Sequence, residues 1–128
     1  MVERMKIPQP RIIIVDPQYL VAMEVERILT ERMACEVQIA MPHECRTALV
    51  ESRWDAIVID GALMNGELRE IIRHVSLAGM AMVFTAFIRD ALGDLGEFPD
   101  AQIVSKPFDD DELTEAVRSA LALRLNPA

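Results

Sequence analysis

Three short runs of consecutive apolar residues constrain the fold of this chain more than any other feature. They extend from Ile12 to Val15, from Ala56 to Ile59 and from Met80 towards Thr85. Successive side chains of a strand point to opposite faces of a sheet, so an unbroken apolar run indicates a strand that is buried on both faces. The runs therefore predict the middle of a parallel sheet that is covered by helices on both sides.

Amphipathic segments separate the predicted strands. Two further short strands are predicted, Glu36 to Ala40 and Gln102 to Ser105, and the first of them alternates as an edge strand does. Helices are predicted over residues 19–33, over 44–51, between 68 and 79, and after residue 109. The apolar positions at helical spacing are Val21, Val25, Ile28 and Leu29, then Leu68, Ile71, Ile72 and Val75, then Leu113, Ala116, Val117, Ala120 and Leu121. The order is that of five βα units, although Gly93, Gly96 and Pro99 break any long helix over residues 87–100.

Size and charge narrow the class of protein. The chain has 128 residues, which suits one domain, and 52% of them are apolar. No apolar run approaches the length of a membrane span, and Met1 to Gln9 lacks the pattern of a secretory signal, so we expect a cytoplasmic protein. A net charge of −8 disfavours nucleic acid and anionic membranes as partners. Cys35 and Cys45 are expected to be reduced packing residues.

Four polar residues follow the predicted strands at the point where each strand ends: Asp16, Asp60, Thr85 and Lys106. The carboxyl ends of parallel strands meet at one edge of the sheet, where open α/β folds bind ligands. There a carboxylate can attack phosphorus, a hydroxyl can hydrogen-bond a phosphoryl oxygen, and an ammonium can pair with another.

The same residues carry a family resemblance. Ile-Val-Asp at 14–16, Ile-Asp at 59–60, Phe-Thr-Ala at 84–86 and Lys-Pro-Phe at 106–108 resemble the motifs of response regulator receiver domains. The resemblance covers residues 11 to about 123. It implies a flavodoxin-like, doubly wound, five-stranded parallel sheet of strand order 2-1-3-4-5. It also implies one receiver domain over residues 1–128, with an N-terminal extension over 1–10 and no output domain.

The resemblance implies a role for each site residue. Asp60 would accept a phosphoryl group from a histidine kinase or phosphotransfer protein. Asp16, Asp60 and the backbone carbonyl of Ala62 would hold magnesium. Thr85 would be the switch hydroxyl, and Lys106 would contact the phosphoryl group, aimed by a cis bond to the proline that follows.

Three departures from the family pattern accompany these matches. Pro17 stands where a second metal-binding acid is usual, so we expect magnesium to bind weakly. Ile103 stands where an aromatic switch residue is usual. The loop after Asp60 lacks the usual proline, and Gly61 and Gly66 make it more flexible.

These departures leave alternatives open for single residues. Asp60 is read as a phosphoacceptor or as a silent carboxylate, and Asp16 as a metal ligand or as a helix N-cap. Lys106 would also offset the repulsion between two carboxylates. The acidic run from Asp109 to Glu112 is read as a helix cap and charged first turn rather than as a metal or partner site.

Two functions are compatible with the sequence. The first is a stand-alone receiver that signals by altered protein contacts with a downstream target, with a homodimer through the last strand and helix as a further option. The second is a pseudo-receiver that binds its partner without phosphorylation. A phosphohydrolase is disfavoured, because Ala62 stands where such enzymes need a general acid.

Methionine and tryptophan positions give further expectations. Four methionines, Met23, Met33, Met80 and Met82, are predicted to fill gaps in the core. Met64 lies in the loop after Asp60 and is the one expected to contact a partner. Trp54, before the central strand, is expected to be a packing residue. 

Overall fold

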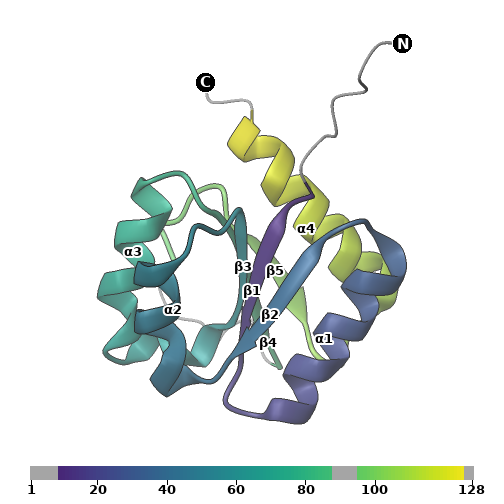
Figure 1. Cartoon of the computed structure of the whole chain (residues 1–128), viewed down its shortest axis with the longest axis horizontal. Coiled ribbons are helices and arrows are strands. Elements are labelled where there is room, and N and C mark those ends of the chain that lie inside the picture. The colour runs from purple at the N-terminus through teal and green to yellow at the C-terminus, as the bar shows by residue number, and fades with distance from the viewer. Residues whose placement is uncertain (1–8, 88–94, 126–128) are drawn as a thin grey trace.

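A computed structural model of the chain describes residues 9–87 and 95–125. Five parallel strands form one sheet in the order β2-β1-β3-β4-β5, as Figure 1 shows. The strands are β1 (Arg11–Val15), β2 (Glu36–Ala40), β3 (Ala56–Asp60), β4 (Ala81–Ala86) and β5 (Gln102–Ser105). The strand order predicted from the resemblance is therefore confirmed.

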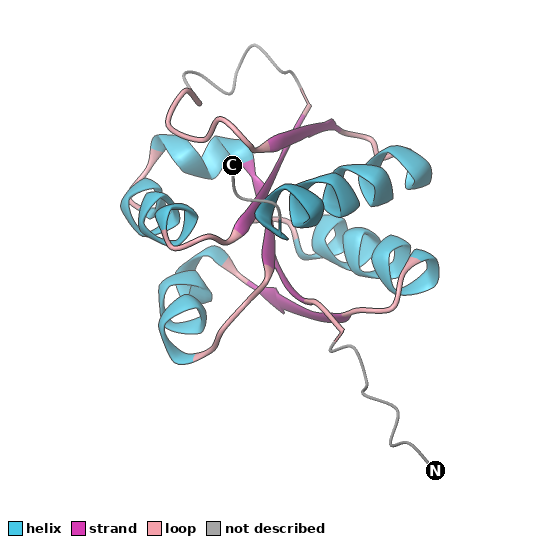
Figure 2. Ribbon diagram, turned by 90° about the horizontal axis from the view of Figure 1, so that it is seen from above, coloured by secondary structure: helices cyan, strands magenta, loops and turns pink. Residues whose placement is uncertain are grey.

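The helices lie on both faces of the sheet (Figure 2). They are α1 (Tyr19–Arg32), α2 (Cys45–Glu51), α3 (Leu68–Leu77) and α4 (Asp110–Leu125). Gly79 ends the turn after α3 with a φ of 102°, a left-handed conformation that suits glycine. The predicted fifth βα unit is present as β5 and α4, whereas the segment after β4 in the fourth unit cannot be compared fully, because residues 88–94, which include Gly93, lie outside the described residues.

Two short 3₁₀ helices were not predicted. The first, η1 (Pro42–Glu44), precedes α2 and is stapled by the Glu44 carboxylate, which accepts the Met41 N–H at 2.8 Å. The second, η2 (Gly61–Asn65), occupies the stretch expected to be a flexible loop. Its first turn is capped by the Asp60 side chain, which accepts the Ala62 N–H. Local hydrogen bonding thus gives these segments regular structure that hydrophobic periodicity does not reveal.

The apolar runs explain the two-sided core. Alternate residues of each central strand face opposite sides, so β1 sends Ile12 and Ile14 to one layer and Ile13 and Val15 to the other. The first layer packs on α1 and α4, and the second packs on α2 and α3. The buried helical residues of the first layer are Ala22, Val25, Ile28, Leu29, Leu113, Val117 and Ala120.

Two methionine predictions were wrong. Met64 is 1% exposed in the core cluster with α3, because the 3₁₀ turn after Asp60 folds its side chain inward. It is therefore not placed to contact a partner. Met23 is 43% exposed on α1 and does not fill the core, whereas Met82 is buried as predicted.

Other packing predictions were confirmed. Trp54 is buried, its indole N–H donates to the Ala48 carbonyl at 3.0 Å, and the Arg11 guanidinium lies 4.5 Å from its ring centroid. Cys35 and Cys45 are free thiols, the second of them buried. None of the described helices is long and apolar enough to cross a membrane.

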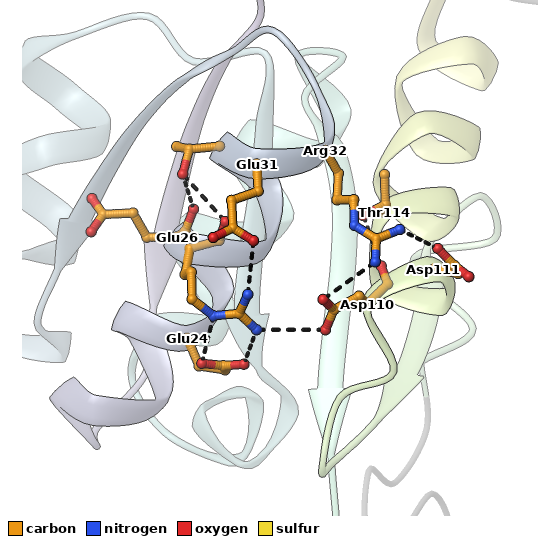
Figure 3. A network of polar contacts seen from close by, with 9 residues as sticks. Glu24, Glu26, Glu31, Arg32, Asp110, Asp111 and Thr114 are labelled. Atoms are coloured by element: carbon orange, nitrogen blue, oxygen red, sulfur yellow. Dashed lines mark hydrogen bonds and ion pairs between the residues drawn. The ribbon is translucent and has the colours of Figure 1, made fainter.

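The acidic run from Asp109 to Glu112 forms the cap and charged first turn of α4, as predicted, and it also forms ion pairs that were not predicted. The Asp109 carboxylate accepts the Glu112 N–H at 2.9 Å. Asp110 and Asp111 face α1, where Arg32 pairs with both of them and Arg27 lies 3.6 Å from Asp110 (Figure 3). This polar network ties the start of α4 to α1.

Candidate functional site

The carboxyl edge of the sheet gathers the predicted site residues. Asp16 directly follows β1, Asp60 is the last residue of β3, and Lys106 directly follows β5. Thr85 lies within β4, where its Cα is paired with that of Asp60. Asp16, Thr85 and Lys106 are buried, and Asp60 is partly exposed. Parallel register therefore delivers four side chains from distant parts of the sequence to one place.

The Lys106 ammonium joins the two carboxylates. Its Nζ lies 2.8 Å from Asp16 Oδ2 and 3.2 Å from Asp60 Oδ2. The Lys106 and Asp16 side chains are each 4% exposed and that of Asp60 is 15% exposed, so solvent screens these ion pairs only weakly. These contacts match the sequence-based expectation that Lys106 offsets the repulsion between two carboxylates.

Backbone amides occupy the other carboxylate oxygens. The Gln18 N–H donates to Asp16 Oδ1 at 2.8 Å, and the Ala62 N–H donates to Asp60 Oδ1 at 2.9 Å. Each is a hydrogen bond from residue i+2 back to an aspartate, which fixes the carboxylate relative to its own turn. All four oxygens of the pair thus accept hydrogen bonds from the protein.

Asp16 is not the N-cap of α1. The N-cap is Gln18, whose carbonyl accepts the N–H groups of Val21 and Ala22. The Asp-Pro pair therefore forms a turn that precedes the helix, and Pro17 is exposed within it. Of the two interpretations of Asp16, the N-cap was wrong, and the metal ligand stays a prediction.

Phe87 is a site residue that the sequence analysis missed. The ring is 67% exposed, and Lys106 Nζ lies 5.2 Å from its centroid, within the range of a cation–π contact. Its position directly after β4, at the edge where the site residues gather, was the available signal. The Phe87 ring is thus a third group next to the Lys106 ammonium, after the Asp16 and Asp60 carboxylates.

The peptide bond between Lys106 and Pro107 is cis, as the resemblance implies. The Lys106 N–H also donates to the Ala86 carbonyl at 2.8 Å, which extends the pairing of β4 with β5 to the lysine itself. The backbone that carries Lys106 is thereby fixed next to the end of β4.

The residues present do not fit a magnesium ion without rearrangement. Magnesium takes oxygen ligands at near-octahedral geometry. Every oxygen of Asp16 and Asp60 already accepts a proton donor, and Pro17 has no ligand atom. No buried side-chain nitrogen or oxygen of the described residues lacks a partner. In residues 9–87 and 95–125, no three histidine, cysteine, aspartate or glutamate side chains are grouped to hold a metal.

Comparisons with known proteins rest on structure alone. No protein-family model matches the sequence, and no curated protein matches it. The fold resembles the signal receiver domain of an HD domain-containing protein from Pseudomonas fluorescens Pf-5, with a TM-score of 0.79 and 18% identity. That match covers 98% of this chain and 96% of the other.

Two further structures extend the comparison. A response regulator receiver domain protein (CheY-like) from Methanospirillum hungatei JF-1 matches with a TM-score of 0.74 and 21% identity over 92% of this chain and 98% of that one. The response regulator PhyR from Brucella abortus matches with a TM-score of 0.72 and 20% identity over 92% of this chain and 50% of that one. This chain therefore has the five-stranded fold of CheY-like response regulator receiver domains.

Proposed function

We propose that this chain is a response regulator receiver that accepts a phosphoryl group on Asp60 and signals through altered protein contacts. The observation that carries the proposal is the pairing of Asp60 with Lys106 at the carboxyl edge, with Thr85 beside it on the next strand. The fold shared with solved receiver domains supports the same role.

The chemistry assigned to Asp60 is nucleophilic. A carboxylate oxygen forms a bond to the phosphorus of a phosphohistidine, and the bond from phosphorus to the donor imidazole nitrogen breaks. The imidazole keeps the electron pair and takes up a proton. Lys106 supplies positive charge beside the transferred group, and the Thr85 hydroxyl hydrogen-bonds one of its oxygens. The switch does not involve an aromatic residue at position 103, because Ile103 is aliphatic.

A surface suited to a protein donor lies next to the site. Helix α1 begins three residues after Asp16, and its first two turns expose Tyr19, Leu20 and Met23 by 54%, 79% and 43%. Exposed apolar groups gathered near a reactive site favour a docked protein partner over a small substrate. The predicted homodimer through β5 and α4 stays a prediction, and part of its surface lies outside the described residues.

Intact-mass measurement after incubation with a small acyl phosphate tests the proposal. We expect a mass increase of one phosphoryl group in the wild type and none in Asp60→Asn. Asp111→Asn removes an exposed carboxylate that pairs with Arg32, so it should keep the adduct. An adduct of equal yield in Asp60→Asn, or none in any protein, would show that Asp60 is not a phosphoacceptor.

A pseudo-receiver is the second candidate. It is favoured by the Lys106 ion pairs, which leave both carboxylates satisfied without a phosphoryl group, and by Pro17. In that case Asp60→Asn would leave partner binding unchanged, whereas Leu20→Glu on the exposed face of α1 would abolish it. Val50→Glu, at a similarly exposed apolar position on α2, is the matched control for added charge.

A further inference from the structure

We infer that Lys106 is the resident cation of the carboxyl edge and that this site works without magnesium. The part of the inference that concerns metal binding is independent of the proposed function. The part that concerns the phosphorylation of Asp60 rests on it. The carboxylate oxygens, the burial of the lysine and the residue after Asp16 each support it.

The carboxylates offer no oxygen that is free of a protein donor. Lys106 holds one oxygen of Asp16 and one of Asp60, and the Gln18 and Ala62 amides hold the others, all within 3.2 Å. Magnesium sheds its own waters reluctantly and demands short, regular distances to its ligands. To bind, the ion would have to displace the ammonium from both of its partners.

The ammonium is enclosed by its surroundings. The Lys106 side chain is 4% exposed, and its Nζ lies 5.2 Å from the centroid of the Phe87 ring. If the ammonium stayed in place, a divalent ion would lie beside a like charge in a poorly solvated site, which is unfavourable. The Lys106 ammonium and a magnesium ion would therefore compete for the same carboxylates.

The carboxyl edge has no acidic side chain directly after Asp16. Pro17 occupies the position directly after Asp16, where a carboxylate would have added a negative charge to this edge. With Pro17 present, the described residues give this edge two carboxylates and one ammonium, so half of the negative charge that would attract a divalent ion is already compensated. The same compensation lets the pair stay buried without a metal.

Magnesium titration followed by calorimetry and by thermal unfolding tests the inference. We expect no binding heat and no magnesium-dependent rise in melting temperature for the wild type. Lys106→Met, which releases both carboxylates, should gain magnesium binding and be stabilised by it. Lys106→Arg keeps the positive charge and is the matched control, so magnesium should not change its melting temperature.

Pro17→Asp provides a second variant in case Lys106→Met does not fold. Its added acid should make magnesium binding measurable where the wild type shows none, which also shows that the assay detects binding. Magnesium binding by the wild type at millimolar concentration, lost in Asp60→Asn, would overturn the inference. So would a magnesium effect in Lys106→Arg as large as that in Lys106→Met.

A separate experiment measures the yield of the Asp60 phosphoryl adduct in the presence of magnesium and in the presence of a chelator. Equal yields support the inference, and an adduct that forms only with magnesium overturns it while leaving the proposed function intact. Absence of the adduct under both conditions counts against the proposed function alone. The titrations then decide whether Lys106 replaces the metal.

Discussion

Arg124 donates to the Asp55 carboxylate at 2.8 Å, although the two residues are 69 positions apart. The other oxygen of Asp55 accepts the Arg11 N–H at 2.7 Å. Asp55 thereby joins the last turns of α4 to the starts of β1 and β3, at the edge of the sheet opposite the site. Partial burial alone would raise the pKa of Asp55, but the Arg11 amide and the Arg124 guanidinium outweigh it and hold that pKa below its ordinary value of 3.8.

The first prediction is that Asp55→Asn destabilises the protein in a pH-dependent way. Loss of charge-assisted hydrogen bonds should lower the free energy of unfolding by about 1–3 kcal/mol at pH 7. A carboxyl whose pKa is lowered by folding stabilises the protein above its unfolded pKa and loses that effect as pH falls through the folded value. Urea unfolding should therefore show a constant difference from wild type above about pH 5 that shrinks below about pH 4.

Asp111→Asn is the control for that experiment. Asp111 pairs with Arg32 in the network of Figure 3, but its side chain is 84% exposed. Exposed ion pairs contribute about 0–1 kcal/mol, so its free energy of unfolding should change little. An equal loss of unfolding free energy in the two variants would show that the hydrogen bonds of Asp55 stabilise the protein no more than an exposed ion pair does.

The second prediction compares two leucines. Leu113 is fully buried between α4 and the sheet, whereas Leu20 is 79% exposed on α1. Leu113→Ala should cost roughly 2–5 kcal/mol of stability through lost burial and the cavity left behind. Leu20→Ala removes the same atoms from an exposed position and should change stability by less than about 0.5 kcal/mol. A similar loss at both sites would contradict the described core.

The third prediction concerns the thiols. Burial raises the pKa of Cys45 to about 11 and also raises the pKa of Cys35, which is only partly buried. Since the thiolate is the reactive form, a thiol reagent at pH 8 should label Cys35 first and Cys45 only when the protein unfolds. Peptide mapping after timed labelling, with Cys35→Ser and Cys45→Ser as controls, distinguishes the two rates. Faster labelling of Cys45 in the native protein would be the contrary result.

The fourth prediction concerns the contact between α1 and α4. Arg27 pairs with Glu24 and Glu31 on its own helix and with Asp110 across the interface. A double-mutant cycle of Arg27→Met and Asp110→Asn isolates the cross-helix term, which should be under about 1 kcal/mol. At 1 M salt the coupling should vanish, because exposed charges are screened. A large coupling that survives salt would mean that the network is buried in solution.

Much of the fold could be predicted because its strands carry unusually clear signals. Both faces of the apolar run from Ala56 to Ile59 have to be buried, which places it in the middle of a sheet that is covered by helices on both sides. Strand order, by contrast, was predicted only from the family resemblance, because an apolar run does not show which strands pair with it. The turn after Asp60 was misjudged because its regularity comes from a side-chain hydrogen bond rather than from periodicity.

The candidate site was predictable in its members but not in its contacts. Strand ends identified Asp16, Asp60, Thr85 and Lys106, because parallel strands deliver them to one edge. The atoms that Lys106 contacts depend on its side-chain conformation. The spacing of residues along the sequence does not predict that conformation. Phe87 was overlooked because it follows the strand in a segment with no periodic pattern. The roles of these residues in phosphoryl transfer stay predictions.

The ion pair between Lys106 and Asp16 joins residues that are 90 positions apart. Between β1 and β5 in the sheet lie β3 and β4, so this is a non-local contact that depends on the pairing of several strands. The two aspartates, which follow the first and third strands along the chain, receive their compensating charge from a residue that follows the last strand. Charge balance at this edge is therefore a property of the complete sheet and not of any one βα unit.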